Sequence, residues 1–189
     1  LYRYDGAKGD WSRVPGLSGH MARFLTGARS GRLASGERVL WVSSSVHGVG
    51  RLQLDAPDTV WRWIAANRNR AMRSSNVSSI AIDGEGHVYA GTAGGLLMLV
   101  PGHTISDSVV IGDVFVASDG LPHEHITALA LSLDQRRLWV GTLEGLGAVE
   151  LRHAESGGAR EPKLTFDVHL ASAESILVEH NSTVQWPER

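Results

Sequence analysis

Val77-Ser78-Ser79-Ile80-Ala81-Ile82 and Ile126-Thr127-Ala128-Leu129-Ala130-Leu131 match position for position at an offset of 49 residues. A second matching pair follows them at an offset of 50, Val88-Tyr89-Ala90-Gly91-Thr92 and Leu138-Trp139-Val140-Gly141-Thr142. The extra residue falls in the turn between the runs, so the strands stay in register. Short β-branched and aromatic runs separated by turns predict a repeat of about 50 residues that is built from strands.

Earlier copies of the same pattern extend the repeat toward the N-terminus. Leu40-Trp41-Val42-Ser43-Ser44 carries Ser-Ser in place of Gly-Thr, and Tyr2-Arg3-Tyr4-Asp5 aligns with Leu52-Gln53-Leu54-Asp55 at an offset of 50. A helical repeat would place apolar residues at i, i+3, i+4 and i+7 over ten or more positions, and the sequence has no such stripe. The pattern therefore predicts an all-β fold, a β-propeller of four-stranded blades.

Turn chemistry places four strands in each complete blade, the innermost one first along the chain. The predicted strands of the first complete blade are Met21–Leu25, Arg38–Ser43, Gly50–Leu54 and Val60–Ile64. Those of the second are Val77–Ile82, His87–Gly91, Leu96–Val100 and Asp113–Ala117. Those of the third are Ile126–Leu131, Arg137–Gly141, Leu146–Leu151 and Leu164–His169. A last, partial blade is predicted from strands at Ser175–Glu179 and Thr183–Trp186.

The domain organisation follows from counting blades. The 189 residues correspond to about 3.8 repeats, whereas propellers close with four to eight blades. We interpret the chain as a single, incomplete propeller domain over 1–189, with partial blades over 1–14 and 171–189 and blades over 15–66, 72–117 and 118–170. Either the two terminal parts share one blade and close a four-bladed ring, or the chain is a segment of a larger propeller. The start at Leu1 and the frequency of larger rings favour the second arrangement.

One repeat carries a fuller motif. It runs through Ser118-Asp119-Gly120-Leu121-Pro122, the Leu138–Thr142 strand and Gly145-Leu146-Gly147. This pattern resembles the two-component regulator propeller repeat. The resemblance implies propellers that form large sensory ectodomains of hybrid histidine kinases and often recognise saccharides, although no kinase or receiver region is present in this sequence. It also implies a periplasmic or extracellular location, the alternative being an intracellular complex.

Composition excludes several function classes. Eighteen Lys and Arg against twenty Asp and Glu give a net charge of −2, so no basic field favours nucleic acid or an anionic membrane. The absence of cysteine excludes disulfides, thiolate metal sites and cysteine nucleophiles. The longest strongly apolar stretch, Gly94–Val100, is far shorter than the roughly 20 residues of a membrane helix. Nucleic acid and a membrane span are therefore not expected.

The polar residues that lead into the innermost strands are the candidate ligand-binding residues. Residues two apart in an extended segment point the same way, so His123-Glu124-His125 offers two imidazoles either to a metal or to a ligand. No HExxH motif or clear carboxylate partner follows, so neither a metal nor a cofactor is expected. The corresponding loops carry His20 and Asn76. All five residues are predicted to converge at the mouth of the channel, where they bind a ligand or satisfy buried backbone groups.

A basic and aromatic stretch is the candidate partner surface. It consists of Trp61, Arg62, Arg68, Arg70 and Arg73. Such a stretch can stack on and pair with a phosphate or a nucleic-acid strand, but the acidic balance of the chain disfavours nucleic acid. The basic stretch therefore fits a contact surface for an acidic protein partner better.

The sequence thus predicts a non-catalytic binding module, which is either a sensor of a small molecule or glycan or a scaffold within a protein complex. The alternative is a propeller enzyme, a metal-assisted lactonase-like hydrolase or lyase with its site at the central channel. Acidic side chains on the innermost strands would favour the enzyme, and Val77–Ile82 and Ile126–Leu131 have none. No catalytic residue is predicted.

Overall fold

The computed structural model describes residues 2–13, 19–54, 61–65, 70–151 and 165–169. The elements of the first sheets are β1 (Tyr2–Asp5), β2 (Asp10–Arg13), α1 (Gly19–Ala22), β3 (Leu25–Arg32), β4 (Arg38–Ser44), β5 (Gly48–Gln53) and β6 (Arg62–Ile64). They are followed by β7 (Val77–Ile82), β8 (Val88–Thr92), β9 (Gly95–Val100), β10 (Val110–Phe115) and a 3-10 turn at Ala117–Asp119. The last sheet has β11 (Ile126–Leu131), β12 (Arg137–Thr142), β13 (Gly145–Glu150) and β14 (Thr165–His169). No helix in these ranges has the length and apolar character needed to cross a membrane.

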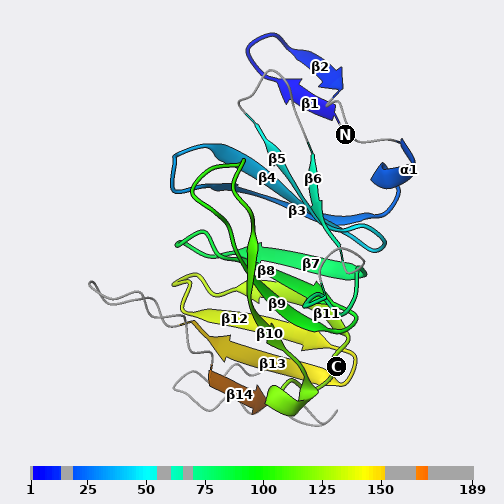
Figure 1. Cartoon of the computed structure of the whole chain (residues 1–189), viewed down its shortest axis with the longest axis vertical. Helices are drawn as coiled ribbons and strands as arrows, with labels where there is room; N and C mark the ends of the chain where they lie inside the picture. The colour runs from blue at the N-terminus through cyan, green and yellow to red at the C-terminus, as the bar shows by residue number, and fades with distance from the viewer. Residues whose placement is uncertain (1, 14–18, 55–60, 66–69, 152–164, 170–189) are drawn as a thin grey trace, which may run out of the picture.

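The strands form three four-stranded antiparallel sheets in chain order, β3-β4-β5-β6, β7-β8-β9-β10 and β11-β12-β13-β14. We call them blades 1, 2 and 3. Strands β1 and β2 make a separate hairpin in which Tyr4 lies opposite Trp11. Figure 1 shows the blades following one another along the long axis, with the hairpin beyond blade 1. This arrangement confirms the predicted all-β fold of four-stranded blades.

Apolar layers hold neighbouring blades together. The layer between blades 1 and 2 contains Leu33, Val39, Trp41, Val49, Met72, Val77, Ile80, Val88, Ala90, Leu97 and Leu99. The layer between blades 2 and 3 contains Ala81, Tyr89, Leu96, Met98, Leu121, Ile126, Leu129, Leu138, Val140, Val149 and Leu151. Trp41 and Tyr89 hold the same motif position and are buried in successive layers. The aromatic residue of the motif therefore packs between adjacent blades.

Each innermost strand begins with the same β-bulge. The register shifts between Leu25 and Gly27, between Val77 and Ser79, and between Ile126 and Ala128. The residue within each bulge carries a hydroxyl group. Thr26 Oγ1 donates to the carbonyl of Val77, and Ser78 Oγ donates to the carbonyl of Ile126, both at 2.6 Å. The bulge thus turns a hydroxyl toward the next blade, where it hydrogen-bonds the start of the next innermost strand.

The Gly-Thr motif lies opposite the β-bulge of the innermost strand, since Val77 pairs with Thr92 and Ser79 with Gly91. The positive φ in this part of blade 2 belongs to Gly95, at the start of the third strand, with φ of 122°. Gly91 is also needed for close packing, because a Cβ there would lie 2.5 Å from Ile126 Cγ2 of the next blade. Thr92 binds the backbone, with Oγ1 donating to the carbonyl of Gly95 at 2.8 Å.

The prediction of the first innermost strand is wrong. Gly19–Ala22 forms α1, and the strand is Leu25–Arg32 rather than Met21–Leu25. This strand is rich in glycine and polar residues, so it lacks the apolar run that marks its counterparts. A Cβ on Gly31 would lie 3.4 Å from Ile82 Cδ1, so side chains of blade 2 provide the apolar cover that the strand itself lacks.

The fourth strand of blade 2 also differs from its prediction. It spans Val110–Phe115 rather than Asp113–Ala117, with a register shift between Ile111 and Asp113, and Ala117 begins the 3-10 turn. The remaining strands lie within two residues of their predicted bounds where the structure describes them. The strands predicted at Ser175–Glu179 and Thr183–Trp186 lie outside the described residues.

Candidate functional site

One end of the blades collects the loops that lead into the innermost strands and the turns between second and third strands. We call this end the loop face; among described residues it comprises 23–24, 45–47, 71–76, 93–94, 116–125 and 143–144. In each blade, an equivalent backbone hydrogen bond joins the turn between the second and third strands to the loop before the innermost strand. These bonds run from Ser45 N–H to Phe24 O at 2.8 Å, from Ala93 N–H to Asn76 O at 3.0 Å and from Leu143 N–H to His125 O at 3.1 Å. Asn76 and His125 therefore hold equivalent positions in adjacent blades.

An ion pair joins two neighbouring loops of this face. Arg73 precedes blade 2 and Glu124 precedes blade 3, and Arg73 Nη1 lies 3.3 Å from Glu124 Oε1. The side chains are 52% and 44% exposed, so both charges remain open to solvent. Gly94 supports the arginine from the adjacent turn, because a Cβ at Gly94 would lie only 3.0 Å from Arg73 Cβ. The loop face thus holds a paired cation and anion that can both reach a ligand.

The two histidines of the predicted cluster take hydrogen-bonding roles. The backbone N–H of His125 donates to His123 Nδ1 at 2.9 Å. Because Nδ1 accepts this bond, the proton of the neutral His123 ring lies on Nε2. The Nδ1 lone pair is therefore committed to the loop. Within the described ranges, no group of three or more His, Asp or Glu side chains is placed to hold a metal ion.

The structure places the other predicted ligand residues differently. Asn76 is exposed on the loop face, directly before β7. His20 lies in α1, and the position in blade 1 that is equivalent to Asn76 belongs to Phe24. The ring of Phe24 packs edge-on against His47, with centroids 6.1 Å apart. The alignment of His20 with Asn76 is therefore wrong, because it depended on the misplaced first strand.

The predicted partner surface is divided between two regions. Trp61 stacks on Trp63 with ring centroids 5.9 Å apart, beside the exposed Arg62 on the outermost strand of blade 1. Arg73 faces Glu124 on the loop face instead. Arg70 is exposed in a turn between β6 and β7, and Arg68 lies outside the described residues.

Sequence reasoning missed the contribution of the turns between second and third strands. His47 lies between the rings of Phe24 and Trp63, with the Trp63 centroid 5.8 Å away. The next residue, Gly48, donates its N–H to the carbonyl of Ser75 in the loop of blade 2 at 3.0 Å. The sequence marks this turn only by the position of His47 in the repeat. His47, like Gly94, directly precedes the positive-φ glycine that begins the third strand of its blade.

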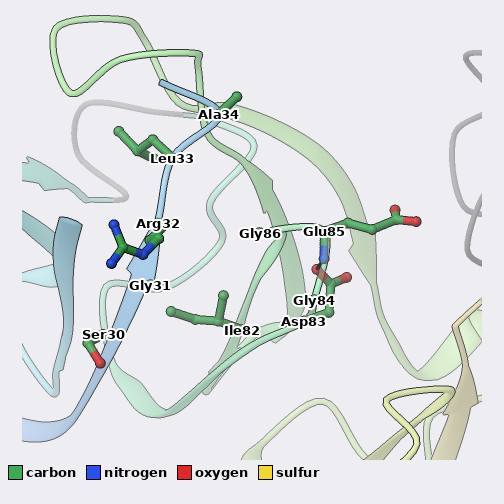
Figure 2. Close-up of a pocket in the computed structure, with 10 residues that line it drawn as sticks. All are labelled: Ser30, Gly31, Arg32, Leu33, Ala34, Ile82, Asp83, Gly84, Glu85 and Gly86. Carbon is green, nitrogen blue, oxygen red and sulfur yellow. Dashed lines mark hydrogen bonds between the residues drawn. The ribbon is translucent and has the colours of Figure 1, made fainter. Parts of the chain in front are cut away.

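The opposite end of the blades, which we call the turn face, carries a cavity of about 410 Å³ between blades 1 and 2. It is lined by residues 30–34 from the end of β3 and by residues 82–86 from the β7–β8 turn. Figure 2 shows Ser30 and Arg32 on one wall and Ile82 and Asp83 on the other, with the Glu85 side chain directed away from the cavity.

Asp83 is the most constrained polar group of that turn. Its Oδ1 accepts the N–H groups of Glu85 at 3.0 Å and His87 at 2.9 Å. Its Oδ2 lies 3.0 Å from His87 Nδ1 and accepts the Tyr89 hydroxyl at 2.9 Å. The Asp83 side chain is only 2% exposed. All four bonds stay within one β-hairpin, so the carboxylate stabilises the fold and has little capacity left for chemistry.

The same contacts shift the pKa values of the cluster. Burial acts to raise the pKa of Asp83. The hydrogen bonds from His87, the charge of His87 and the hydrogen bond from the Tyr89 hydroxyl outweigh burial, so the pKa of Asp83 is lowered. The hydrogen bond and charge of Asp83 raise the pKa of His87 against the effect of burial. Burial and the Asp83 charge raise the pKa of Tyr89. Protonated His87 therefore stabilises the folded chain.

We expect the free energy of unfolding to fall as pH rises above about 6.5. A raised folded-state pKa gives His87 a stabilising contribution that is complete below its unfolded pKa of roughly 6.5 and is lost as pH rises through the folded pKa. Urea unfolding between pH 5.5 and 9 measures this, and His87→Gln should flatten the curve. His103→Gln is the control and should leave the fall in place; a fall that persists in His87→Gln contradicts the assignment.

Comparisons with known proteins address the fold. No protein-family model and no curated protein matches the chain. The extracellular domain of BT3049 from B. thetaiotaomicron, a protein described as a hybrid two-component system, superposes with a TM-score of 0.58 at 16% identity over 86% of this chain. That likeness agrees with three four-stranded blades packed in succession. The fold is a β-propeller.

The propeller spans only part of its solved relatives. It covers 20% of the BT3049 domain, and identity at this level shows the fold alone. The Cps50 (Swd1) β-propeller domain of Myceliophteria thermophila is 14% identical with a TM-score of 0.49, and the match covers 68% of this chain and 42% of that one.

Proposed function

We propose that this propeller is a non-catalytic binding module that recognises an oligosaccharide through its loop face. The supporting observation is the exposed pair of Arg73 and Glu124, which presents guanidinium donors and carboxylate acceptors side by side from adjacent blades. The exposed amide of Asn76, directly before β7, adds a donor and an acceptor to the same face. A hydroxyl-rich ligand both donates and accepts hydrogen bonds, so its chemistry matches this mixed surface.

We also propose that the chain belongs to the two-component regulator propeller repeat family. Each residue of the Asp-Gly-Leu-Pro motif has a structural role that supports this. Asp119 Oδ2 accepts the N–H of Val116 at 3.0 Å, and Gly120 is left-handed with φ of 105°. Leu121 is buried, and the Pro122 ring covers Gly147, where a Cβ would lie 3.2 Å from Pro122 Cδ. Membership supports a sensor ectodomain in the periplasm or outside the cell.

The two alternatives have less support. A metal-assisted hydrolase or lyase needs ligands that converge at the channel, and the buried acidic group of the described chain, Asp83, has its hydrogen-bonding capacity taken up by its own hairpin. A scaffold that uses the basic and aromatic stretch would bind through Trp61 and Arg62 rather than Arg73. Loss of binding on substitution of those two residues alone would favour the scaffold.

The proposal is tested by titrating the chain with soluble neutral and acidic oligosaccharides in isothermal calorimetry. We expect Arg73→Ala to weaken the best ligand about tenfold, which is the effect of losing one charge-assisted hydrogen bond. Arg136→Ala is the matched control, because Arg136 is exposed on the turn face of blade 3 and should change affinity less than about twofold.

Two results would contradict the proposal. One is the absence of binding to any oligosaccharide at millimolar concentration. The other is an equal loss of affinity in Arg73→Ala and Arg136→Ala, which would place the site away from the loop face.

A further inference from the structure

The turn-face cavity lies between two blades, at the end of the blades opposite the loop face. Its volume of about 410 Å³ falls within the range of small-molecule sites in proteins, roughly 300 to 1,000 Å³. One wall is formed by residues 30–34 at the end of β3 in blade 1, and the other by residues 82–86 in the β7–β8 turn of blade 2 (Figure 2). A molecule bound in the cavity would therefore contact both blades.

Backbone groups at the free edge of β3 form part of the first wall. Leu33 donates its N–H to the carbonyl of Glu37 at 3.0 Å, across the β3–β4 turn. Bonded and non-bonded pairs alternate along an antiparallel ladder, so the backbone N–H and C=O groups of Ser30 and Arg32 are directed away from β4. Strand β3 is the edge strand of its sheet, and the carbonyl oxygen of Arg32 lies 3.6 Å from the Cβ position of Gly86. These groups therefore face the β7–β8 turn rather than another strand.

The side chains and turn amides that the fold leaves available in the lining can all donate hydrogen bonds. Arg32 donates from Nη1 to the carbonyl of Gly36 at 3.1 Å, but its guanidinium forms no ion pair with a described residue and keeps further N–H groups for a ligand. The Ser30 hydroxyl has no hydrogen-bond partner among the described residues. The same holds for the backbone N–H groups of Ala34 and Gly84, one in each wall. The cavity thus offers a cation together with neutral donors from both blades.

Neither acidic residue of the lining pairs with Arg32. The Asp83 side chain is only 2% exposed, and its oxygens accept bonds within their own hairpin. The negative charge of Asp83 also lies beside His87, whose Nδ1 is 3.0 Å away and whose pKa it raises. The Glu85 side chain is directed away from the cavity (Figure 2). Arg32 is therefore the accessible charge of the described lining.

An apolar surface lies beside these donors. Ile82 is half-buried, and its Cδ1 would lie 3.4 Å from a Cβ at Gly31, so the glycine allows the isoleucine to approach β3 closely. Leu33 is buried in the layer between blades 1 and 2, and Ile82 packs against that layer. A hydrocarbon group in the cavity would cover the exposed part of Ile82, and removing this apolar surface from water favours binding.

We propose that the turn-face cavity binds a small organic carboxylate, whose carboxylate group pairs with Arg32 and whose carbon skeleton lies against Ile82. A carboxylate only accepts hydrogen bonds, and its two oxygens match both the guanidinium and the available N–H groups. The apolar surface beside the cation favours an organic anion over inorganic phosphate. This site is separate from the oligosaccharide site proposed for the loop face, and neither proposal depends on the other.

Binding is measured in the full chain with sodium lactate and sodium succinate. Lactamide and succinamide are the uncharged counterparts, and sodium chloride keeps the ionic strength constant. In isothermal calorimetry we expect at least one of the two carboxylates to bind at millimolar concentration or below, and at least about tenfold more tightly than its amide, which lacks the charge-assisted pair. The bound carboxylate should also raise the midpoint of thermal unfolding, because it binds the folded chain.

Arg32→Gln tests the assigned cation. The substitution removes the charge but keeps an amide donor, and it should weaken carboxylate binding at least about tenfold. Arg29→Gln is the matched control, because Arg29 is exposed on the same strand but does not line the cavity, and it should change affinity less than about twofold. Both arginines are exposed, so the thermal midpoints without carboxylate should stay close to that of the unsubstituted chain.

Amide chemical shifts locate the site without any substitution. Lactate or succinate should shift the amide signals of Ala34 and Gly84, on the two walls, and leave those of Ala93 and Leu143, on the loop face, unchanged. Shifts confined to the loop face overturn the proposal, since the carboxylate then occupies the other site. It is equally overturned if neither carboxylate binds at millimolar concentration, if the amides or sodium phosphate bind as tightly, or if the two arginine variants weaken binding equally.

Discussion

Asp83→Ala is expected to lower the free energy of unfolding by about 3 to 5 kcal/mol, the range for removing one partner of a buried charged pair. The substitution removes four hydrogen bonds at once. It leaves the Tyr89 hydroxyl buried without its acceptor and removes the charge that raises the pKa of His87. Urea unfolding followed by tryptophan fluorescence measures the loss.

The matched control is Asp134→Ala in the corresponding turn of blade 3. Its carboxylate also caps the turn, accepting the Ser132 hydroxyl at 2.5 Å and the Arg136 N–H at 3.1 Å, but Asp134 is exposed. Water replaces those bonds, so the urea midpoint should move far less than in Asp83→Ala. Similar losses in the two variants would show that burial is not what gives Asp83 its importance.

The architecture was predictable because strand repeats depend on local pattern. The Leu138–Thr142 motif and its copies fix the strand positions, since a wedge aromatic, a small residue and a hydroxyl are each required by contacts inside or between blades. Thr142 Oγ1, for example, donates to the carbonyl of Gly145 at 2.9 Å, as Thr92 does to Gly95. Because each blade requires the same bonds, the same residue types recur in each copy of the motif.

The first innermost strand was not predictable from that pattern because its apolar cover comes from another blade. Gly27 leaves room for Ile80, and Gly31 leaves room for Ile82. Each isoleucine lies more than fifty residues further along the chain than its glycine. The apolar residues of Met21–Leu25 therefore resemble a strand more closely than Leu25–Arg32 does, and no sequence pattern marks the helical turn at Gly19–Ala22.

The candidate site was predicted in part for the same reason. The sequence placed Asn76, Glu124 and His125 in loops before innermost strands, and the structure has them there. The contact of Arg73 with Glu124 joins residues 51 apart and carries no sequence signature, so Arg73 was assigned to a separate surface. The saturation of Asp83 likewise depends on Tyr89, which lies on the following strand.

Gly95→Ala is expected to cost about 3 kcal/mol or more, the sum of two separate penalties. The residue has φ of 122°, and leaving glycine at a positive φ costs an L residue roughly 1 to 2 kcal/mol. A Cβ would also lie 2.4 Å from the carbonyl oxygen of Phe115, so β10 must move away from β9. Such overpacking typically adds about 1 to 3 kcal/mol. Urea unfolding again provides the measurement.

Gly36→Ala separates the two penalties. Gly36 has a positive φ of 88° in the β3–β4 turn, but no heavy atom lies within 4 Å of its Cβ position. It should therefore lose only the conformational part, about 1 kcal/mol. The difference between the two losses of unfolding free energy then measures the close contact with Phe115, through which the outermost strand of blade 2 packs against β9. Equal losses would mean that β10 yields without cost and that backbone conformation alone explains why glycine begins the third strand of each blade.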